Sequence, residues 1–125
     1  AWGGDAKNID LPHNYIPNSC VYTGTHDNDT TVGWFNSVAG KGSGRDAEQI
    51  KKETEFCKKY LQTDGTEIHW DFIRAVLASV ANTAIIPMQD LLGLGNDARM
   101  NLPGSTKGNW YWRCQAKNFD KKIAE

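Results

Sequence analysis

Two short runs of strand-forming residues, 20–23 and 83–88, each end abruptly in polar side chains. Between them lie two segments with helical periodicity, over 46–61 and 70–82. A strand followed by helices and a second strand is the βαβ pattern, in which the two strands run parallel. Two strands are too few to form an independent sheet with a useful core. We therefore expect this chain of 125 residues to be one piece of a larger α/β protein.

The sequence also predicts the bounds of its elements from turn signals and apolar periodicity. In chain order they are a loop over 1–19, a strand over 20–25, a short helix over 30–38 with Thr30 or Thr31 as N-cap, a glycine-rich connection over 39–44, helices over 46–61 and 70–82, a strand over 83–88, a loop or short helix over 91–95, and a surface helix beginning near 117.

The two long helices are predicted to differ in burial. The first is amphipathic, and its charged residues Lys51, Lys52, Glu53 and Lys58 are expected on a solvated face. The second is predicted to be largely buried, with an apolar stripe of Trp70, Ile73, Leu77 and Val80 widened by Phe72, Val76 and Ala81. The nearly all-apolar run 83–88 is typical of a strand covered on both faces.

Composition excludes several classes of protein. A formal net charge of −1 gives no electrostatic reason to expect nucleic acid or an anionic membrane as partner. No run of 18 apolar residues indicates a transmembrane helix, and the N-terminus lacks the pattern of a signal peptide. Cys20, Cys57 and Cys114 match neither a disulfide framework nor a zinc spacing. Reduced thiols and a cytoplasmic location are therefore expected.

The densest cluster of ionisable residues follows the first strand, over 25–29. Polar side chains at the C-terminal end of a buried parallel strand are typical of an active site. Three functions are compatible with this cluster. Its carboxylate and imidazole groups could bind a polar substrate, Asp27 and Asp29 could bind a metal ion, or His26 and Asp27 could be the His–Asp pair of a nucleophilic triad. The spacing lacks the glycine and the glutamate of a calcium loop. Neighbouring side chains on a strand point to opposite faces, which disfavours a bond between His26 and Asp27.

A structural interpretation competes with these three. Asn28 and Asp29 are of the residue types that form turns and cap helices, and this role is favoured for both. Asp27 stands at the rim where the strand ends, so a functional role is favoured for it. Five tryptophans and twelve glycines in so short a chain suit a carbohydrate site, since sugar rings present apolar faces to aromatic rings, but they also suit an ordinary core.

Five blocks of sequence, in order, resemble glycoside hydrolase family 77, the 4-α-glucanotransferases known as amylomaltase or disproportionating enzyme. The blocks extend to residue 113 and cover most of the chain. They are Leu11-Pro12-His13-Asn14-Tyr15, the run from Tyr22 to Thr30 around His26-Asp27-Asn28, the run from Pro87 to Gly95, the run from Ala98 to Gly104, and Gly108-Asn109-Trp110-Tyr111-Trp112-Arg113.

The resemblance implies a (β/α)8 barrel that transfers segments of α-1,4-glucan between maltooligosaccharides by a retaining mechanism without a cofactor or metal. Residues 1–125 would be the C-terminal portion of that catalytic barrel, about strands seven and eight with the helices that follow. The family uses three carboxylates. Asp27 matches the third, which stabilises the transition state, and His26 matches a histidine that contacts the sugar. The nucleophile and the acid/base precede residue 1 in the family, so the isolated chain is not expected to catalyse.

Other residues receive roles from the same resemblance. Asn101 matches a substrate contact, and Trp2 matches either an aromatic residue beside the acceptor channel or a loop anchor. For Gln89 and Asp90, holding loops by hydrogen bonds is favoured over direct contact with sugar. Packing of the C-terminal end against the barrel is favoured for Trp110, Trp112 and Arg113, with lining of the groove by one of them as the alternative, and His13 and Tyr15 are expected in a loop near the site.

Two other functions remain open at this point. The chain is either such a transferase segment, a non-catalytic module that binds glucan or another partner, or part of a hydrolase of the same clan. The transferase and the hydrolase differ in whether a sugar hydroxyl or water resolves the glycosyl-enzyme intermediate.

Overall fold

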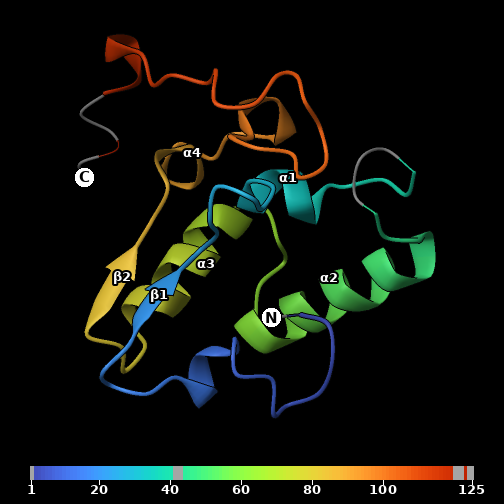
Figure 1. Ribbon diagram of the computed structural model, residues 1–125. Coiled ribbons are helices and arrows are strands. Elements are labelled where there is room, and N and C mark those ends of the chain that lie inside the picture. Colours follow the sequence, from blue (N-terminus) through green and yellow to red (C-terminus); the bar gives the residue numbers. More distant parts are fainter. Residues whose placement is uncertain (1, 41–43, 120–122, 124–125) are drawn as a thin grey trace.

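The two predicted strands form a parallel pair. The computed structural model describes residues 2–40, 44–119 and 123. In it β1 (Cys20–Tyr22) pairs with β2 (Thr83–Ile85), so that Val21 lies opposite Ala84. The parallel order is confirmed, although both strands are shorter than predicted. Because parallel strands end at the same edge, the loops that follow β1 and β2 meet at one end of the pair (Figure 1).

Four α-helices accompany the strands in the described ranges. They are α1 (Thr31–Phe35), α2 (Ala47–Leu61), α3 (Ile68–Leu77) and α4 (Met88–Leu91), with 3-10 turns at Pro12–Asn14, Asn96–Ala98 and Ala116–Asn118. Helix α3 contacts α1, α2 and α4, which makes it the centre of the packing. Helices α1 and α4 and the segment 96–119 lie beyond the C-terminal ends of the strands (Figure 1). None of these helices is long and apolar enough to cross a membrane.

Side chains cap the starts of α1 and α2; the cap of α1 by Thr30 is one of the two predicted, whereas no cap was predicted for α2. The hydroxyl of Thr30 accepts a 3.0 Å bond from the amide of Gly33, and Asp46 accepts a 2.8 Å bond from the amide of Gln49. Such caps satisfy backbone N–H groups that have no partner within the helix. The predicted helix over 30–38 therefore exists but is shorter, and α2 has nearly the predicted bounds. The part of the predicted tail helix beyond residue 119 lies mostly outside the described residues.

The prediction that Glu53 belongs to a solvated face of α2 is wrong. Its side chain is buried, with Nη1 of Arg45 at 2.5 Å from Oε2 and Nε2 of Gln49 donating to Oε1 at 2.8 Å. Helical periodicity places Glu53 on the same side as the buried Cys57, and the paired Arg45 compensates the buried charge. The lysines of α2 named above are exposed, as predicted.

Burial of α3 and β2 is also less complete than predicted. Ile68, Ile73 and Val76 are buried, but Leu77 is 62% exposed and Val80, beyond the end of α3, is 58% exposed. Ile85 of β2 is 47% exposed, so this strand is not covered on both faces. An apolar face is buried only where another layer packs on it, and in the described part of the chain no such layer covers these three side chains.

Candidate functional site

The polar cluster lies in a turn directly after β1. The strand ends at Tyr22, so His26 and Asp27 have turn rather than strand geometry. Nε2 of His26 lies 3.4 Å from Oδ1 of Asp27, and each side chain is about half exposed. The two side chains lie close together and not on opposite faces, because the strand rule applies only to residues within β1, which ends before them. The pair is an ion pair whenever His26 is protonated.

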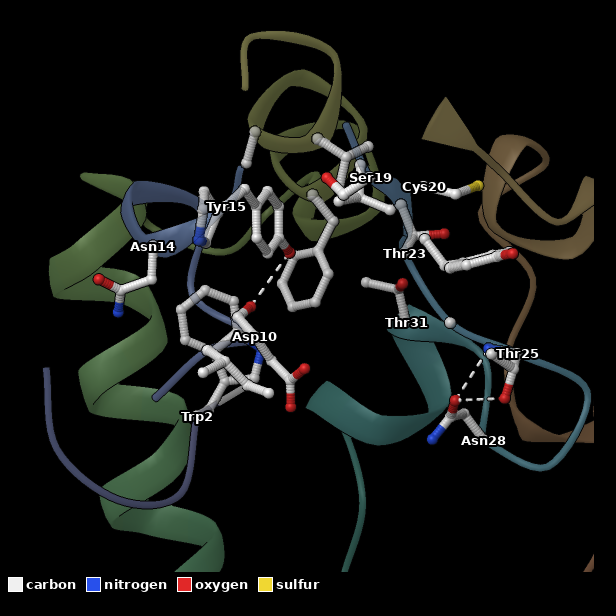
Figure 2. A pocket seen from close by; sticks show the side chains of 18 of the residues that line it. Trp2, Asp10, Asn14, Tyr15, Ser19, Cys20, Thr23, Thr25, Asn28 and Thr31 are labelled. Carbon is white, nitrogen blue, oxygen red and sulfur yellow. Dashed lines mark hydrogen bonds between the residues drawn. The ribbon is translucent and has the colours of Figure 1, made fainter. Parts of the chain in front are cut away.

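Asn28 and Asp29 shape this turn, as predicted. Oδ1 of Asn28 accepts bonds of 2.8 and 2.9 Å from the amide and the hydroxyl of Thr25 (Figure 2). Asp29 accepts a 2.8 Å bond from the amide of Thr30 and a 2.6 Å bond from the side chain of Asn96. These contacts use the two side chains for local structure and fix the backbone around Asp27.

Asp90, in α4, connects the turn after β1 to α1 and α4 by hydrogen bonds. It is 2% exposed, and its carboxylate accepts a 2.5 Å bond from the hydroxyl of Thr23 and a 2.7 Å bond from the amide of Thr31. Gln89 donates a 3.3 Å bond to the carbonyl of Ala98. The predicted loop-holding role is confirmed for both residues: Asp90 joins β1, α1 and α4, and Gln89 holds the segment that follows α4.

Asn101, in the segment that follows α4, contacts the candidate acid Asp27. Its Nδ2 donates a 2.6 Å hydrogen bond to Oδ1 of Asp27. The guanidinium of Arg99 donates to the backbone carbonyls of both residues, from Nη2 to Asp27 and from Nε to Asn101, each at 2.8 Å. The structure thus brings together three of the predicted site residues, His26, Asp27 and Asn101.

Trp110 completes this side of the site. Its ring lies 5.1 Å from that of His26, centroid to centroid, at 36° between planes. It adopts a left-handed backbone conformation, with φ of 65°, and its amide donates a 2.7 Å bond to the carbonyl of Met100. Both rings line a cavity of about 180 Å³, together with Arg99 and Asp90. Trp110 therefore packs against the turn itself, and it is still 53% exposed.

Trp2 does not lie with these residues. It forms an aromatic cluster with Trp34, Phe56, Tyr60 and Phe72 at centroid distances of 5.2 to 6.3 Å. This cluster anchors the N-terminal loop on the helices, which fits the loop-anchor role. Trp2 also lines a larger cavity, of about 680 Å³, whose far side is formed by Thr25 and Asn28 (Figure 2). Its predicted contact with substrate stays a prediction.

The N-terminal loop contributes polar groups to the larger cavity. The hydroxyl of Tyr15 donates a 3.0 Å bond to the carbonyl of Asp10. Burial raises the pKa of Tyr15, and the nearby Asp10 and Tyr60 add to the rise, so the phenol stays protonated at neutral pH. His13 does not reach this cavity lining; its ring nitrogens bond the hydroxyl of Tyr60 and the carbonyl of Ala6.

The arrangement is suited to binding neighbouring hydroxyl groups. The half-exposed carboxylate of Asp27 accepts hydrogen bonds, the amide of Asn101 both donates and accepts, and His26 supplies a further polar group. The described residues contain no group of three His, Cys, Asp or Glu side chains able to hold a metal ion. The chemistry available here is hydrogen bonding and charge stabilisation by one carboxylate.

Two features of the site were missed by reasoning from the sequence. Arg99 belongs to the block from Ala98 to Gly104, yet no role was assigned to it, and the contact of Trp110 with His26 was not foreseen. The only available signal was the presence of both residues in blocks that resemble the family. Neither spacing nor periodicity predicts a contact across more than 70 residues of sequence.

Comparison with known proteins supports one family. The sequence profile described as 4-alpha-glucanotransferase, glycoside hydrolase family 77, matches residues 1–118. The chain is 45% identical over 124 residues to a 4-alpha-glucanotransferase of Clostridium butyricum, covering 99% of this chain and 24% of the relative. It is 49% identical over 127 residues to the chloroplastic and amyloplastic 4-alpha-glucanotransferase of Arabidopsis thaliana, covering all of this chain and 20% of that protein.

A solved structure agrees with the sequence comparison. The chain superposes on amylomaltase from Streptococcus agalactiae in complex with acarbose, with a TM-score of 0.78 and 34% identity. The match covers 98% of this chain and 22% of that one. The chain thus spans between a fifth and a quarter of the length of these relatives.

Proposed function

The chain belongs to glycoside hydrolase family 77, the 4-alpha-glucanotransferases, and from this premise we propose that it is the segment of such an enzyme that supplies the third carboxylate, Asp27. The segment would be the C-terminal portion of a (β/α)8 barrel, with β1 and β2 as about the seventh and eighth strands. In such barrels the active site lies at the C-terminal ends of the strands. The turn with His26 and Asp27 follows β1 at that end, which supports this placement.

The proposed reaction moves a glucan segment from one α-1,4-glucan to another. A nucleophilic carboxylate attacks the anomeric carbon while a carboxylic acid protonates the departing oxygen, and a sugar hydroxyl then takes the segment from the enzyme. Both of these groups would come from the rest of the barrel. The chain's own part is to bind ring hydroxyls through Asp27 and His26 as positive charge develops on the sugar.

The proposed substrates are maltooligosaccharides. The proposed location is the cytoplasm, because all three cysteines are free, as expected in a reducing compartment.

The single observation that supports the role of Asp27 is its environment. Its carboxylate is half exposed, faces the amide of Asn101 at 2.6 Å and has the imidazole of His26 at 3.4 Å. The loop-holding Asp90, by contrast, is 2% exposed and its carboxylate is occupied by Thr23 and Thr31. Asp27 is held in place and remains accessible to a ligand.

The test uses the complete protein that carries this segment. We expect Asp27→Asn to lower the rate of maltotriose disproportionation by about 10²–10³, the cost typical of losing one contact made in the transition state. Asp97→Asn changes an exposed acid in the 3-10 turn that follows α4 and should leave the rate unchanged. A near wild-type rate for Asp27→Asn would contradict the proposed role.

The products of the same assay separate the two enzymatic interpretations. Transfer to a second sugar yields oligosaccharides longer than maltotriose together with glucose, whereas hydrolysis yields only shorter sugars. If the complete protein binds maltoheptaose but converts no substrate, the non-catalytic module is the correct alternative.

A further inference from the structure

We propose that Arg99 is a positioning residue that holds the backbones of Asp27 and Asn101 at a fixed separation, so that their side chains form a ready-made pair for two neighbouring hydroxyls of one sugar ring. The inference rests on the proposed function, because it concerns the same site. It adds a residue that makes no contact with the sugar itself and acts through two residues that do.

The geometry of Arg99 carries the argument. Its Nη2 donates to the carbonyl of Asp27 and its Nε donates to the carbonyl of Asn101, each at 2.8 Å. The third nitrogen, Nη1, lies 4.0 Å from Oδ2 of Asp29. One guanidinium therefore bridges the turn after β1 and the segment after α4, and its side chain is only 16% exposed.

A guanidinium is suited to this bridge because it is planar and its N–H groups point in fixed directions. Carbonyls bound to Nε and Nη2 are held at a separation set by the covalent frame of the arginine. A lysine keeps the charge but concentrates its donors on one nitrogen, so it does not hold two carbonyls in this geometry. Asn96 reinforces the bridge with its 2.6 Å bond to Asp29, whose charge faces Nη1.

Arg99 binds the backbone and leaves both side chains free to engage a ligand. In the unliganded protein the Asn101 amide donates to the Asp27 carboxylate at 2.6 Å. A vicinal diol fits this pair, since one hydroxyl donates to the carboxylate and the oxygen of its neighbour accepts from the amide. The exchange of partners requires no movement of the two backbones, which Arg99 continues to hold. Such pre-organisation is the condition under which hydrogen bonds favour a transition state.

The first test measures kinetics in the complete protein. Arg99→Lys should lower kcat for maltotriose disproportionation about 10- to 100-fold, since a misplacement of about 1 Å near the reacting centre has costs of this order. KM should change much less, because the lost interaction acts in the transition state. Arg74→Lys is the matched control: Arg74 is an exposed arginine of α3 whose Nη1 lies 3.1 Å from Asp71.

A double-mutant cycle shows whether Arg99 acts through Asn101. If it does, Arg99→Lys should lower kcat much less in an Asn101→Ala background than in the wild type. Losses that multiply in the double variant, or an unchanged kcat in Arg99→Lys, would overturn the inference. A merely structural role would lower Tm and leave the two losses independent.

The second test is independent of activity. A crystal structure of the Arg99→Lys variant should show Asn101 Nδ2 and Asp27 Oδ1 separated beyond hydrogen-bond range, by more than about 3.5 Å. Retention of the short contact would overturn the positioning role. If the wild-type protein shows no glucan transfer, the proposed function fails, while this structure still decides whether Arg99 holds the pair.

Discussion

Asn101 donates a 2.6 Å hydrogen bond from Nδ2 to Oδ1 of Asp27, across 74 residues of sequence. The contact joins the turn after the first strand to the segment that follows α4. It places an amide, with both donor and acceptor atoms, against the carboxylate on which the proposed function depends.

Removal of this amide should weaken catalysis without unfolding the protein. We expect Asn101→Ala to lower kcat/KM for maltotriose disproportionation about 10- to 100-fold, the effect of losing one or two hydrogen bonds to a charged group. Asn101→Asp should be worse, because two adjacent carboxylates repel each other and one of them takes up a proton. Asn82→Ala, at an exposed position just before β2 and at the opposite end of the strands, is the control. Equal activity of the Asn101 variants and the control would exclude a role for this side chain.

The buried carboxylate of Asp90 should matter for stability. Asp90→Ala leaves the hydroxyl of Thr23 and the amide of Thr31 without their partner, so we expect a loss of about 3 kcal/mol or more in the free energy of unfolding. Thr23→Val removes only one of the two bonds and should cost about 1 kcal/mol. Chemical denaturation of the complete protein measures both. Equal losses for the two variants would show that the bond to Thr31 contributes nothing.

Alanine substitutions at two glycines should show how much stability is lost through a left-handed backbone alone and how much through steric crowding. Gly65 and Gly104 have φ of 85° and 78°. A Cβ at Gly65 would lie 2.5 Å from Cζ of Phe35, whereas nothing lies within 4 Å of one at Gly104. Gly104→Ala should therefore cost about 1–2 kcal/mol for the left-handed backbone alone. Gly65→Ala should cost about 1–3 kcal/mol more, because Phe35 must move. The comparison is made by Tm, and similar values for both would mean that Phe35 moves freely.

The buried thiol of Cys57 should make the stability of the protein depend on pH. Burial raises the pKa of Cys57 from 9.0 to about 12, and Asp71 adds to the rise. Between about pH 9 and 12 the unfolded thiol therefore loses its proton while the folded one keeps it. The unfolded state binds fewer protons in this window, so the contribution of Cys57 to stability is complete below pH 9 and falls as pH rises.

The measurement compares the wild type with Cys57→Ala, which has no group to titrate at this position. The difference in Tm between the two proteins should be constant up to about pH 9 and should shrink above it. A difference that stays constant to pH 10.5 would show that the folded thiol ionises normally.

Much of the local structure follows from the sequence. The period of apolar residues placed α2, and the βαβ order predicted the parallel pair that β1 and β2 form. Capping by Thr30 and the loop-holding role of Asp90 were also predicted correctly. Each of these features depends on residues that are close together in the sequence, such as those around a helix start or just after a strand. They can therefore be predicted without knowledge of the tertiary structure.

Burial was predicted less well, because it depends on what packs against an element. The apolar pattern predicts burial of Leu77 and Val80, which are exposed, and the charge pattern predicts a solvated face for Glu53, which is buried and paired with Arg45. Periodicity tells which residues share a face. It does not tell whether a second layer covers that face.

The sequence by itself determined which residues stand at the ends of the strands, and its resemblance to a family singled out Asp27, His26 and Asn101 as candidates. Only the tertiary structure decided which side chains meet. It brought Asn101 and Arg99 to Asp27, packed the Trp110 ring against that of His26, and put Trp2 in an aromatic cluster with the helices. The physical reason is that a hydrogen bond or ring contact depends on distances of a few ångströms, and between segments 70 residues apart these are set by packing rather than by order in the chain.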